Sequence, residues 1–441
     1  MGTPFWTATA IFVLVYAAIV LDFSHKTVVA LSGASLILLF KILDQHEAFH
    51  TEELGVDWNV IILLISMMLI ISMMRPSGIF EYIAIKSAKL GRGNPARILV
   101  IFSVVTAVLS AFLDNVTTVL LIAPVVVLIA DALEVDSMPY LISCALASNI
   151  GGTATLIGDP PNIMIASKAE LNFMDFVYNL TPVIVIIMVF YVFAIKLIWG
   201  KGLRTRDALR QKIMAMDENE AIKDPAMVKK SLVVLALVMT GFVFHGSLGL
   251  QPATIALSGA ALLFLISGTS EPHIAFSDVE WSTLFFFIGL FIIVGGVVKV
   301  GLIKWMALKA IELTHGNMLG TSMAVMWFSA FASAFIDNIP YVATMNPLTV
   351  DMAHQLWPGL SGTALLHKPE LMPVWWSLAL GACLGGNGTV IGASANVVVV
   401  GMSEKMGKKI SFGRFMLYGM PLMLMSVVIS SLYVWLRYYV F

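Results

Sequence analysis

The feature that most constrains this chain is an internal repeat. Three pairs of segments match in the same order, namely 57–78 with 280–301, 110–126 with 333–349, and 151–165 with 385–399. The first two pairs share an offset of 223 residues, and the third follows an 11-residue insertion in the second half. The matches preserve Ser-Ala-Phe-x-Asp-Asn and paired glycines, which a lipid-facing surface does not require. We therefore interpret the chain as two copies of one structural unit.

The composition determines the solvent in which these copies fold. Of the 441 residues 59% are hydrophobic and 12% charged, about half the charge of a soluble domain. No aqueous fold of this length could hide so much apolar side chain, so the solvent must be lipid. This excludes a soluble enzyme, a nucleic-acid-binding protein and a disordered chain. The net charge of -1 gives no attraction to polyanions, and two cysteines exclude a disulfide framework.

Ten apolar stretches are long enough to cross a bilayer as helices: 5–21, 28–43, 58–74, 139–168, 176–199, 231–247, 252–268, 281–300, 373–402 and 415–436. Glycine-rich segments interrupt 139–168 and 373–402. Two more stretches, 96–133 and 318–356, each divide at an Asp-Asn pair. Each is either two further spans or one helical hairpin that enters and leaves the membrane by the same side.

The distribution of basic residues favours hairpins. With hairpins, 19 of the 26 Lys and Arg residues fall on one side, counting Lys26 and Lys196 at span ends. Because basic residues accumulate in cytoplasmic loops, this predicts an inner (cytoplasmic) membrane protein with both termini outside. The exception is the outer segment 299–309, which we interpret as a helix lying flat at the interface, where lysines can reach water.

We therefore predict an all-α polytopic membrane protein made of two inverted repeats. Each repeat has five transmembrane helices, one re-entrant hairpin and one broken helix, and the odd number of crossings turns the second copy upside down. The predicted parts are a first repeat over 1–200 (hairpin 96–133, broken helix 139–168), a cytoplasmic linker over 201–229, and a second repeat over 230–441 (hairpin 318–356, broken helix 373–402). Inverted repeats with interrupted helices are typical of secondary transporters, whose site lies between the repeats near the midplane.

The hairpin tips carry the first candidate site residues, Asp114-Asn115 and Asp337-Asn338. An ionised carboxylate inside a membrane costs about 2.5–3.5 kcal/mol, so each Asp should face water, a cation or a proton. The oxygens of these four residues could bind Na⁺. The alternative is that each Asp only caps the returning helix.

The broken helices carry the second set of candidates. Gly151–Thr155 and Gly385–Thr389 allow unwinding, which exposes carbonyl and hydroxyl oxygens that can coordinate a cation. Asp159 has no acidic counterpart, because Ala393 takes its place, so it is either a helix cap or the mark of a one-sided function. The candidate substrate- and ion-binding residues are Asp114, Asn115, Thr117, Asn149, Gly152, Thr153, Thr155, Asp159, Asn162, Asp337, Asn338, Asn387, Thr389 and Asn396.

Other chemistry finds little support in the sequence. The chain has no phosphate-binding G-x-x-x-x-G-K-[ST] motif and no H-E-x-x-H constellation, so we predict neither an enzyme nor a cofactor beyond Na⁺ or H⁺ as coupling ion. A separate cytoplasmic ATPase subunit remains compatible with the sequence. Cys144 and Cys383 are either small packing residues or, near the breaks, ligands for a soft substrate.

These motifs resemble the ion transporter superfamily, and within it the arsenite permease/sodium–proton antiporter (ArsB/NhaD) family, which includes the melanosomal P protein. The matching segments are FLDNVTTVLLIAPV (112–125), SNIGGTATLIGDPPNIMIAS (148–167) and FIDNIPYVATM (335–345). The resemblance implies a homodimer, a scaffold with a mobile transport unit built from the hairpins and broken helices, and elevator-like alternating access.

The resemblance also bears on the substrate. Dicarboxylate–sodium symporters of the superfamily carry Ser-Asn-Thr at the tips, whereas this chain has Asp at the serine position in both halves. Two carboxylates beside a dianion would repel it by several kcal/mol in a poorly hydrated site. We therefore predict a proton-coupled antiporter or efflux permease for an inorganic substrate, either arsenite/antimonite or sodium. The alternative is a sodium- or proton-coupled anion or dicarboxylate transporter.

Overall fold

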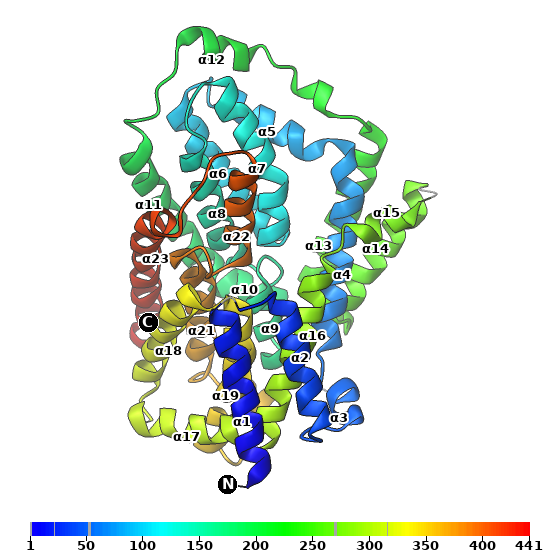
Figure 1. Cartoon of the computed structure of the whole chain (residues 1–441), viewed down its shortest axis with the longest axis vertical. Helices are drawn as coiled ribbons and strands as arrows, with labels where there is room; N and C mark the ends of the chain where they lie inside the picture. Colours follow the sequence, from blue (N-terminus) through cyan, green and yellow to red (C-terminus); the bar gives the residue numbers. More distant parts are fainter. Residues whose placement is uncertain (1, 22, 52–53, 269–270, 315) are drawn as a thin grey trace.

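The computed structural model describes residues 2–21, 23–51, 54–268, 271–314 and 316–441. All regular secondary structure in these ranges is helical (Figure 1). Nine helices among the described residues are long and apolar enough to span a membrane. The prediction of an all-α polytopic membrane protein is confirmed.

The first half contains eleven α-helices and one short 3₁₀ helix. They are α1 (Thr3–Val20), α2 (Lys26–Leu39), α3 (Gln45–His50), α4 (Trp58–Met74), η1 (Arg75–Ser77), α5 (Ile79–Leu90), α6 (Pro95–Phe112), α7 (Asn115–Ala132), α8 (Met138–Gly152), α9 (Pro160–Ala169), α10 (Phe173–Asn179) and α11 (Thr181–Trp199). The predicted hairpin 96–133 corresponds to α6 and α7, and the predicted broken helix 139–168 to α8 and α9.

The linker and the second half follow the same plan. They comprise α12 (Asp207–Met214), η2 (Glu218–Ala221), α13 (Pro225–Leu248), α14 (Pro252–Ser267), α15 (Pro272–Ser277), α16 (Trp281–Lys299), α17 (Leu302–Thr314), α18 (Met318–Phe335), α19 (Asn338–Leu356), α20 (Thr363–Leu366), α21 (Met372–Gly385), η3 (Gly386–Gly388), α22 (Ser394–Lys405), α23 (Phe412–Trp435) and η4 (Leu436–Val440). Here α18 and α19 form the second hairpin, and α21 and α22 the second broken helix.

Some helix limits differ from the sequence prediction. Helix α13 begins at Pro225, inside the predicted linker, because Asp224 caps it and accepts a hydrogen bond from the Met227 amide at 2.9 Å. The predicted span 28–43 shortens to Lys26–Leu39, and 176–199 divides into α10 and α11 at Leu180. Proline at the second position of α11 lacks an amide hydrogen, which a first helical turn tolerates.

One pair of glycine contacts has the same partners in the two halves. A Cβ on Gly33 would lie 2.4 Å from Val15 Cγ2 and 2.9 Å from Ile293 Cδ1. A Cβ on Gly259 would lie 2.2 Å from Val238 Cγ2 and 3.6 Å from Ile70 Cδ1. At the repeat offset of 223 residues, Val238 corresponds to Val15 and Ile70 corresponds to Ile293. The close contact with valine therefore occurs in both halves, and the isoleucine contact is looser in the second.

The same glycines show that the halves exchange helices. Gly33 lies on α2 of the first half and meets α16 of the second, whereas Gly259 lies on α14 of the second half and meets α4 of the first. Helices α2 and α16 pack together extensively, as do α14 and α4. Because each half completes the other's helix group, the two repeats form one body.

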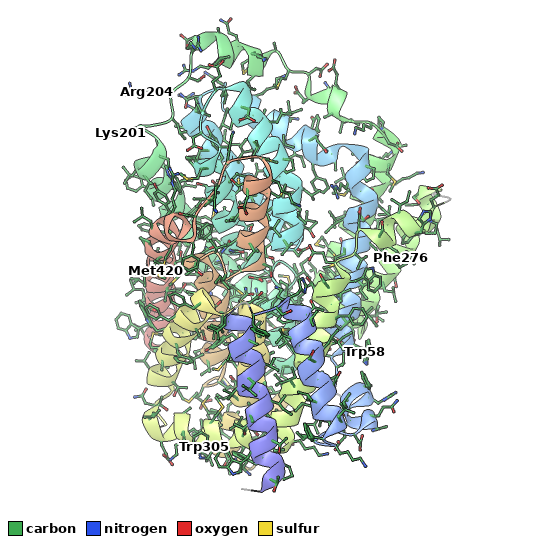
Figure 2. All side chains as sticks on the ribbon, viewed as in Figure 1. Trp58, Lys201, Arg204, Phe276, Trp305 and Met420 are labelled. Carbon is green, nitrogen blue, oxygen red and sulfur yellow. The ribbon has the colours of Figure 1, made fainter. Side chains whose placement is uncertain are left out.

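The basic linker and the flat helix lie at opposite ends of the molecule. Lys201 and Arg204 precede α12 at one end, and Trp305 of α17 lies at the other (Figure 2). Helix α17 runs across that end of the bundle, as expected for a helix at an interface (Figure 1). The linker is docked on α5, where Lys89 forms an ion pair with Glu218 and donates to the Met216 carbonyl oxygen at 3.0 Å.

Candidate functional site

The tip of the first hairpin is held by its own helix. Asp114 caps α7 and accepts a hydrogen bond from the Thr117 amide at 2.8 Å and another from the Thr117 hydroxyl. Its side chain is buried and has no basic partner among the described residues. The capping predicted as the alternative role is therefore present at this tip, and Thr117 serves that cap.

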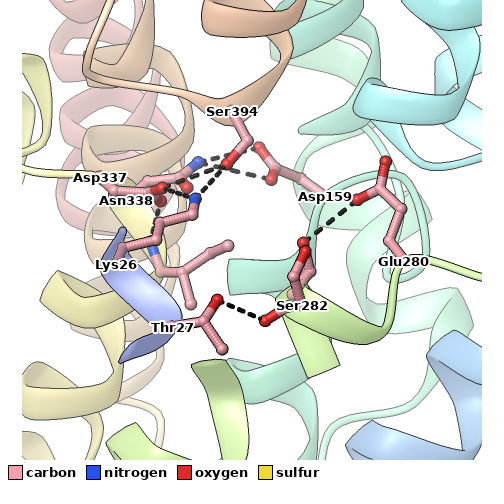
Figure 3. Close-up of polar contacts among 10 residues, drawn as sticks. Lys26, Thr27, Asp159, Glu280, Ser282, Asp337, Asn338 and Ser394 are labelled. Atoms are coloured by element: carbon pink, nitrogen blue, oxygen red, sulfur yellow. Dashed lines mark hydrogen bonds and ion pairs between the residues drawn. The ribbon is translucent and has the colours of Figure 1, made fainter. Parts of the chain in front are cut away.

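The tip of the second hairpin is held by another part of the chain. Asp337 caps α19 through the Ile339 amide at 3.2 Å, and its Oδ2 accepts a hydrogen bond from Lys26 Nζ at 2.7 Å (Figure 3). The Ser394 hydroxyl donates to the same oxygen at 3.1 Å. The sequence places Lys26 at a span end on the basic side, and the structure adds that its ammonium lies at the hairpin tip. The ion pair gives Asp337 an additional role besides capping.

Asp159 links the two tips. It occupies the N-cap position of α9, but its side chain makes no capping hydrogen bond. Instead Oδ1 accepts from Asn115 Nδ2 at 3.3 Å, and both oxygens accept from Asn338 Nδ2 at 3.4 Å. Its side chain is fully buried. Of the two roles considered for Asp159, the capping hydrogen bond is thus not formed, and the one-sided function stays a prediction.

A network of amides extends from the tips to the helix breaks. Asn149 Oδ1 accepts from Asn115 at 3.1 Å. Asn149 Nδ2 donates to Asn387 Oδ1 at 2.8 Å and Asn396 Oδ1 at 3.0 Å. All of these side chains are buried, so each hydrogen bond replaces one to water. The candidate asparagines of both halves therefore meet in one polar centre.

Other candidate residues hold the unwound segments in shape. Asn162 Nδ2 donates to the carbonyl oxygens of Thr153 and Thr155 at 3.2 and 2.8 Å, and Asn396 Nδ2 donates equivalently to Gly386 and Thr389 at 2.8 and 2.9 Å. The hydroxyls of Thr155 and Thr389 donate back to their own hairpins, at Ala111 and Ala334. Among the described contacts these threonine hydroxyls thus stabilise the breaks and do not point to a shared ligand.

Gly152 is required by a close backbone approach. A Cβ there would lie 2.4 Å from the Gly158 carbonyl oxygen, and the equivalent Gly386 approaches Gly392 in the same way at 2.9 Å. Among the cysteines, Cys383 Sγ contacts Asn162 Oδ1 at 3.4 Å, whereas Cys144 is buried in the core.

A small acidic cavity lies between the tips. It has a volume of about 20 Å³, enough for about one water molecule or a dehydrated monovalent ion. Three carboxylates line it, those of Asp114, Asp159 and Glu280, together with Asn115, Asn338, Thr283 and Ser394. The cavity lining contains no Lys, Arg or His. Within the described residues no group of three or more His, Cys, Asp or Glu side chains is arranged as a metal site.

The predicted Na⁺ ligands therefore divide into two sets. Asp114, Asn115 and Asn338 face the cavity, whereas Asp337 is neutralised by Lys26 and is not part of the cavity lining. Sequence reasoning missed Lys26, Ser394 and Glu280 as site residues. Glu280 could have been found, because the repeat aligns it with Asp57 and retains the acidic group. The segment ALSGA, present at 30–34 and 256–260, would have aligned Lys26 with Pro252.

A larger vestibule of about 960 Å³ opens elsewhere. It is lined by the start of α4, the end of α9, the turn between α13 and α14, and the end of α19. Leu63 lines the vestibule, and the next residue, Leu64, lines the acidic cavity. The two spaces therefore both border α4.

Comparisons with known proteins agree with this architecture. Residues 16–381 match the CitMHS family, described as citrate transporters. The chain belongs to this family. A protein of Mycobacterium bovis named an uncharacterized transporter is 44% identical over 98% of this chain and 98% of its own length. The protein is accordingly a multi-pass membrane transporter of the CitMHS family.

Two further similarities concern the superfamily and the fold. The P protein of Homo sapiens is 31% identical over 97% of this chain, which corresponds to 59% of the human protein. The YdaH transporter of Alcanivorax borkumensis has a similar fold, with a TM-score of 0.51 at 13% identity over 98% of both chains. The CitMHS match and the similarity to the P protein support the ion transporter superfamily, and the likeness to YdaH concerns the fold alone. The narrower assignment to arsenite permeases and sodium–proton antiporters stays a prediction.

Proposed function

We propose that this transporter is a secondary active antiporter that exchanges protons for a small inorganic substrate, either sodium or a neutral hydroxide of arsenic or antimony. The observation that carries the proposal is the 20 Å³ cavity, which three carboxylates line without a basic residue. Such a cavity favours a cation or a proton.

The physical reason is electrostatic. Carboxylates that share a poorly hydrated space repel each other, and the repulsion falls when one takes up a proton or when a cation enters. The repulsion therefore makes proton binding and cation binding alternatives at the same oxygens. A neutral hydroxide could enter this space with a proton on one carboxylate, but a free anion could not do so without further positive charge.

The fold suggests how access could alternate. We propose that α1, α2, α4, α13, α14 and α16 form a scaffold, and that the two hairpins with the two broken helices form the moving unit. The tips and breaks share the hydrogen-bond network, so a rigid-body displacement of this unit would carry the site with it. A homodimeric scaffold, elevator-like movement and the orientation with both termini outside belong to this proposal.

Transport of a carboxylate anion is the second candidate, and the description of the CitMHS family favours it. Citrate would need positive charge at the site. Lys26 is the one basic side chain that forms an ion pair with a tip residue among the described residues, and Asp337 already neutralises it. The acidic cavity therefore supports the inorganic substrate more strongly.

Transport by the purified protein in proteoliposomes under an imposed pH gradient tests the proposal. Sodium, arsenite and citrate are offered separately. We expect proton-driven flux of sodium or arsenite, and loss of this flux in Asp159→Asn. Asp131→Asn, which changes an exposed carboxylate paired with Lys408 outside the site, is the matched control. Flux of citrate with neither inorganic substrate would overturn the proposal.

A further inference from the structure

Lys26 forms an ion pair between two groups of helices that also pack on each other through α16 and α19. It begins α2, which packs on α1 and α16. Its ammonium, however, donates to Asp337 Oδ2 at 2.7 Å and to the Ser394 hydroxyl at 2.8 Å, on the second hairpin and on α22. The ring of Phe286 on α16 lies beneath the ammonium, with its centroid 5.1 Å from Nζ.

A second contact reinforces the same junction. The Tyr16 hydroxyl on α1 donates to the Pro340 carbonyl oxygen at 2.8 Å and lies 2.7 Å from the Thr344 hydroxyl. Both partners belong to α19, which begins directly after Asp337. The pair α1 and α2 therefore holds the second hairpin at its tip and one turn beyond it.

The equivalent junction is missing in the other half. The repeat aligns Lys26 with Pro252 and Ser394 with Pro160, so neither the ammonium nor the hydroxyl has a counterpart. Asp114 is retained but has no ion pair among the described residues, and Pro252 lines the 960 Å³ vestibule. The start of α2 thus contacts a hairpin, whereas the start of α14 borders the vestibule.

We infer that Lys26 is an electrostatic latch that holds the second hairpin against the scaffold, and that a proton or a sodium ion arriving at Asp337 releases it. The inference rests on the proposed function and adds regulation to the same site. The ammonium occupies the position that a free monovalent cation would take, with a carboxylate and a hydroxyl as its ligands.

The chemistry of release is a simple exchange of charge. When Asp337 binds a proton or Na⁺, Lys26 remains protonated and loses its ionic partner. Its side chain is 30% exposed, so the ammonium can turn to water on its flexible stem. The charged groups that surround the latch are Asp159, which Asn338 connects to the tip, with Glu280 and Asp114 across the acidic cavity. All three are acidic and attract the entering cation.

Hydrogen–deuterium exchange on the full-length protein in lipid nanodiscs tests the latch without any transport assay. The amides to follow are those of 26–30 and of 338–342, apart from Pro340, which has no amide hydrogen. Lys26→Gln should raise their exchange at least about tenfold, because a hydrogen-bonded charge is lost. Lys26→Arg should keep exchange slow. Lys309→Gln, which breaks the exposed pair with Glu312 on α17, is the matched control and should change neither segment.

Ion dependence separates a latch from a structural ion pair. In the wild type, raising Na⁺ or lowering the pH should speed exchange at both segments, and in Lys26→Gln this response should disappear. The reversed pair Lys26→Asp with Asp337→Lys should restore slow exchange if the single variants fold poorly. Exchange in Lys26→Gln equal to wild type, or a wild type indifferent to both Na⁺ and pH, would overturn the inference. A wild type that shows the ion response but transports neither sodium nor arsenite would instead refute the proposed function.

Discussion

The two hairpin tips have nearly the same sequence but different environments. Asp114 is bonded within its own helix and faces the acidic cavity, whereas Asp337 is paired with Lys26 from the other half. The adjoining break carries Asp159 in the first half and Ala393 in the second. The comparison teaches that the symmetric backbone supplies the frame, and that a few unmatched side chains make the two halves chemically different.

The largest loss of transport is expected at Asp159, the acidic residue that has no counterpart in the second half. Asp159→Asn removes the carboxylate that accepts hydrogen bonds from Asn115 and Asn338. We expect proton-driven transport to fall about 10- to 100-fold, since hydrogen bonds to charged groups contribute about 1.5–3 kcal/mol. Initial rates in proteoliposomes measure it. Ala393→Asp, at the equivalent position, should not restore transport to Asp159→Asn. Restoration would show that the halves are interchangeable.

Substitutions at the helix breaks test the backbone packing that the two halves share. A Cβ on Gly151 would lie 2.0 Å from the Ala107 carbonyl oxygen, and on Gly385 2.5 Å from that of Ala330. Both alanine variants should unfold more easily, Gly151→Ala by about 3 kcal/mol and Gly385→Ala by less, because backbone cannot move aside as a side chain can. Thermal unfolding in detergent ranks them. Gly401→Ala, with open space around its Cβ, is the control.

The tips themselves should differ in stability. Asp337→Asn leaves Lys26 without its carboxylate, and we expect a loss of about 1–2 kcal/mol, reduced by the exposure of Lys26. Asp114→Asn keeps a capping oxygen, and Asn caps about as well as Asp, so the loss should be smaller. Thermal unfolding of both variants side by side measures the difference. Equal losses would mean that the ion pair adds nothing to the second tip.

The smallest effect concerns the linker, which docks on α5 of the first half. The Lys89 ammonium holds the pKa of the Glu218 carboxyl below its usual value. The stability that the Lys89–Glu218 ion pair contributes is therefore present above the pKa of Glu218 in the unfolded chain. It is lost as the pH falls through the lower pKa of Glu218 in the folded state. Limited proteolysis within 201–224 should accelerate slightly at acidic pH, and Glu218→Gln should remove that pH dependence. Cleavage that is independent of pH in the wild type would contradict it.

Much of the architecture follows from the sequence because its physical causes are local. Long apolar runs require lipid, Asp114 and Asp337 are recognisable as caps between two helical arms, and glycines mark the breaks at 153–159 and 386–393. Repetition of these signals indicated two equivalent halves. The convergence of Asn149, Asn387 and Asn396 was likewise predictable, because equivalent breaks meet where equivalent halves meet.

The pairing of Lys26 with Asp337 was decided by the tertiary structure alone. Residues 311 positions apart meet only because α2 packs on α16 of the other half, and local patterns carry no information about that exchange. Charge counting placed Lys26 at a span end, where lysine usually reaches water, and did not identify its partner. Composition and periodicity thus determined the solvent, the helices and the repeat, whereas the long-range packing of exchanged helices decided which carboxylate is neutralised and which faces the cavity.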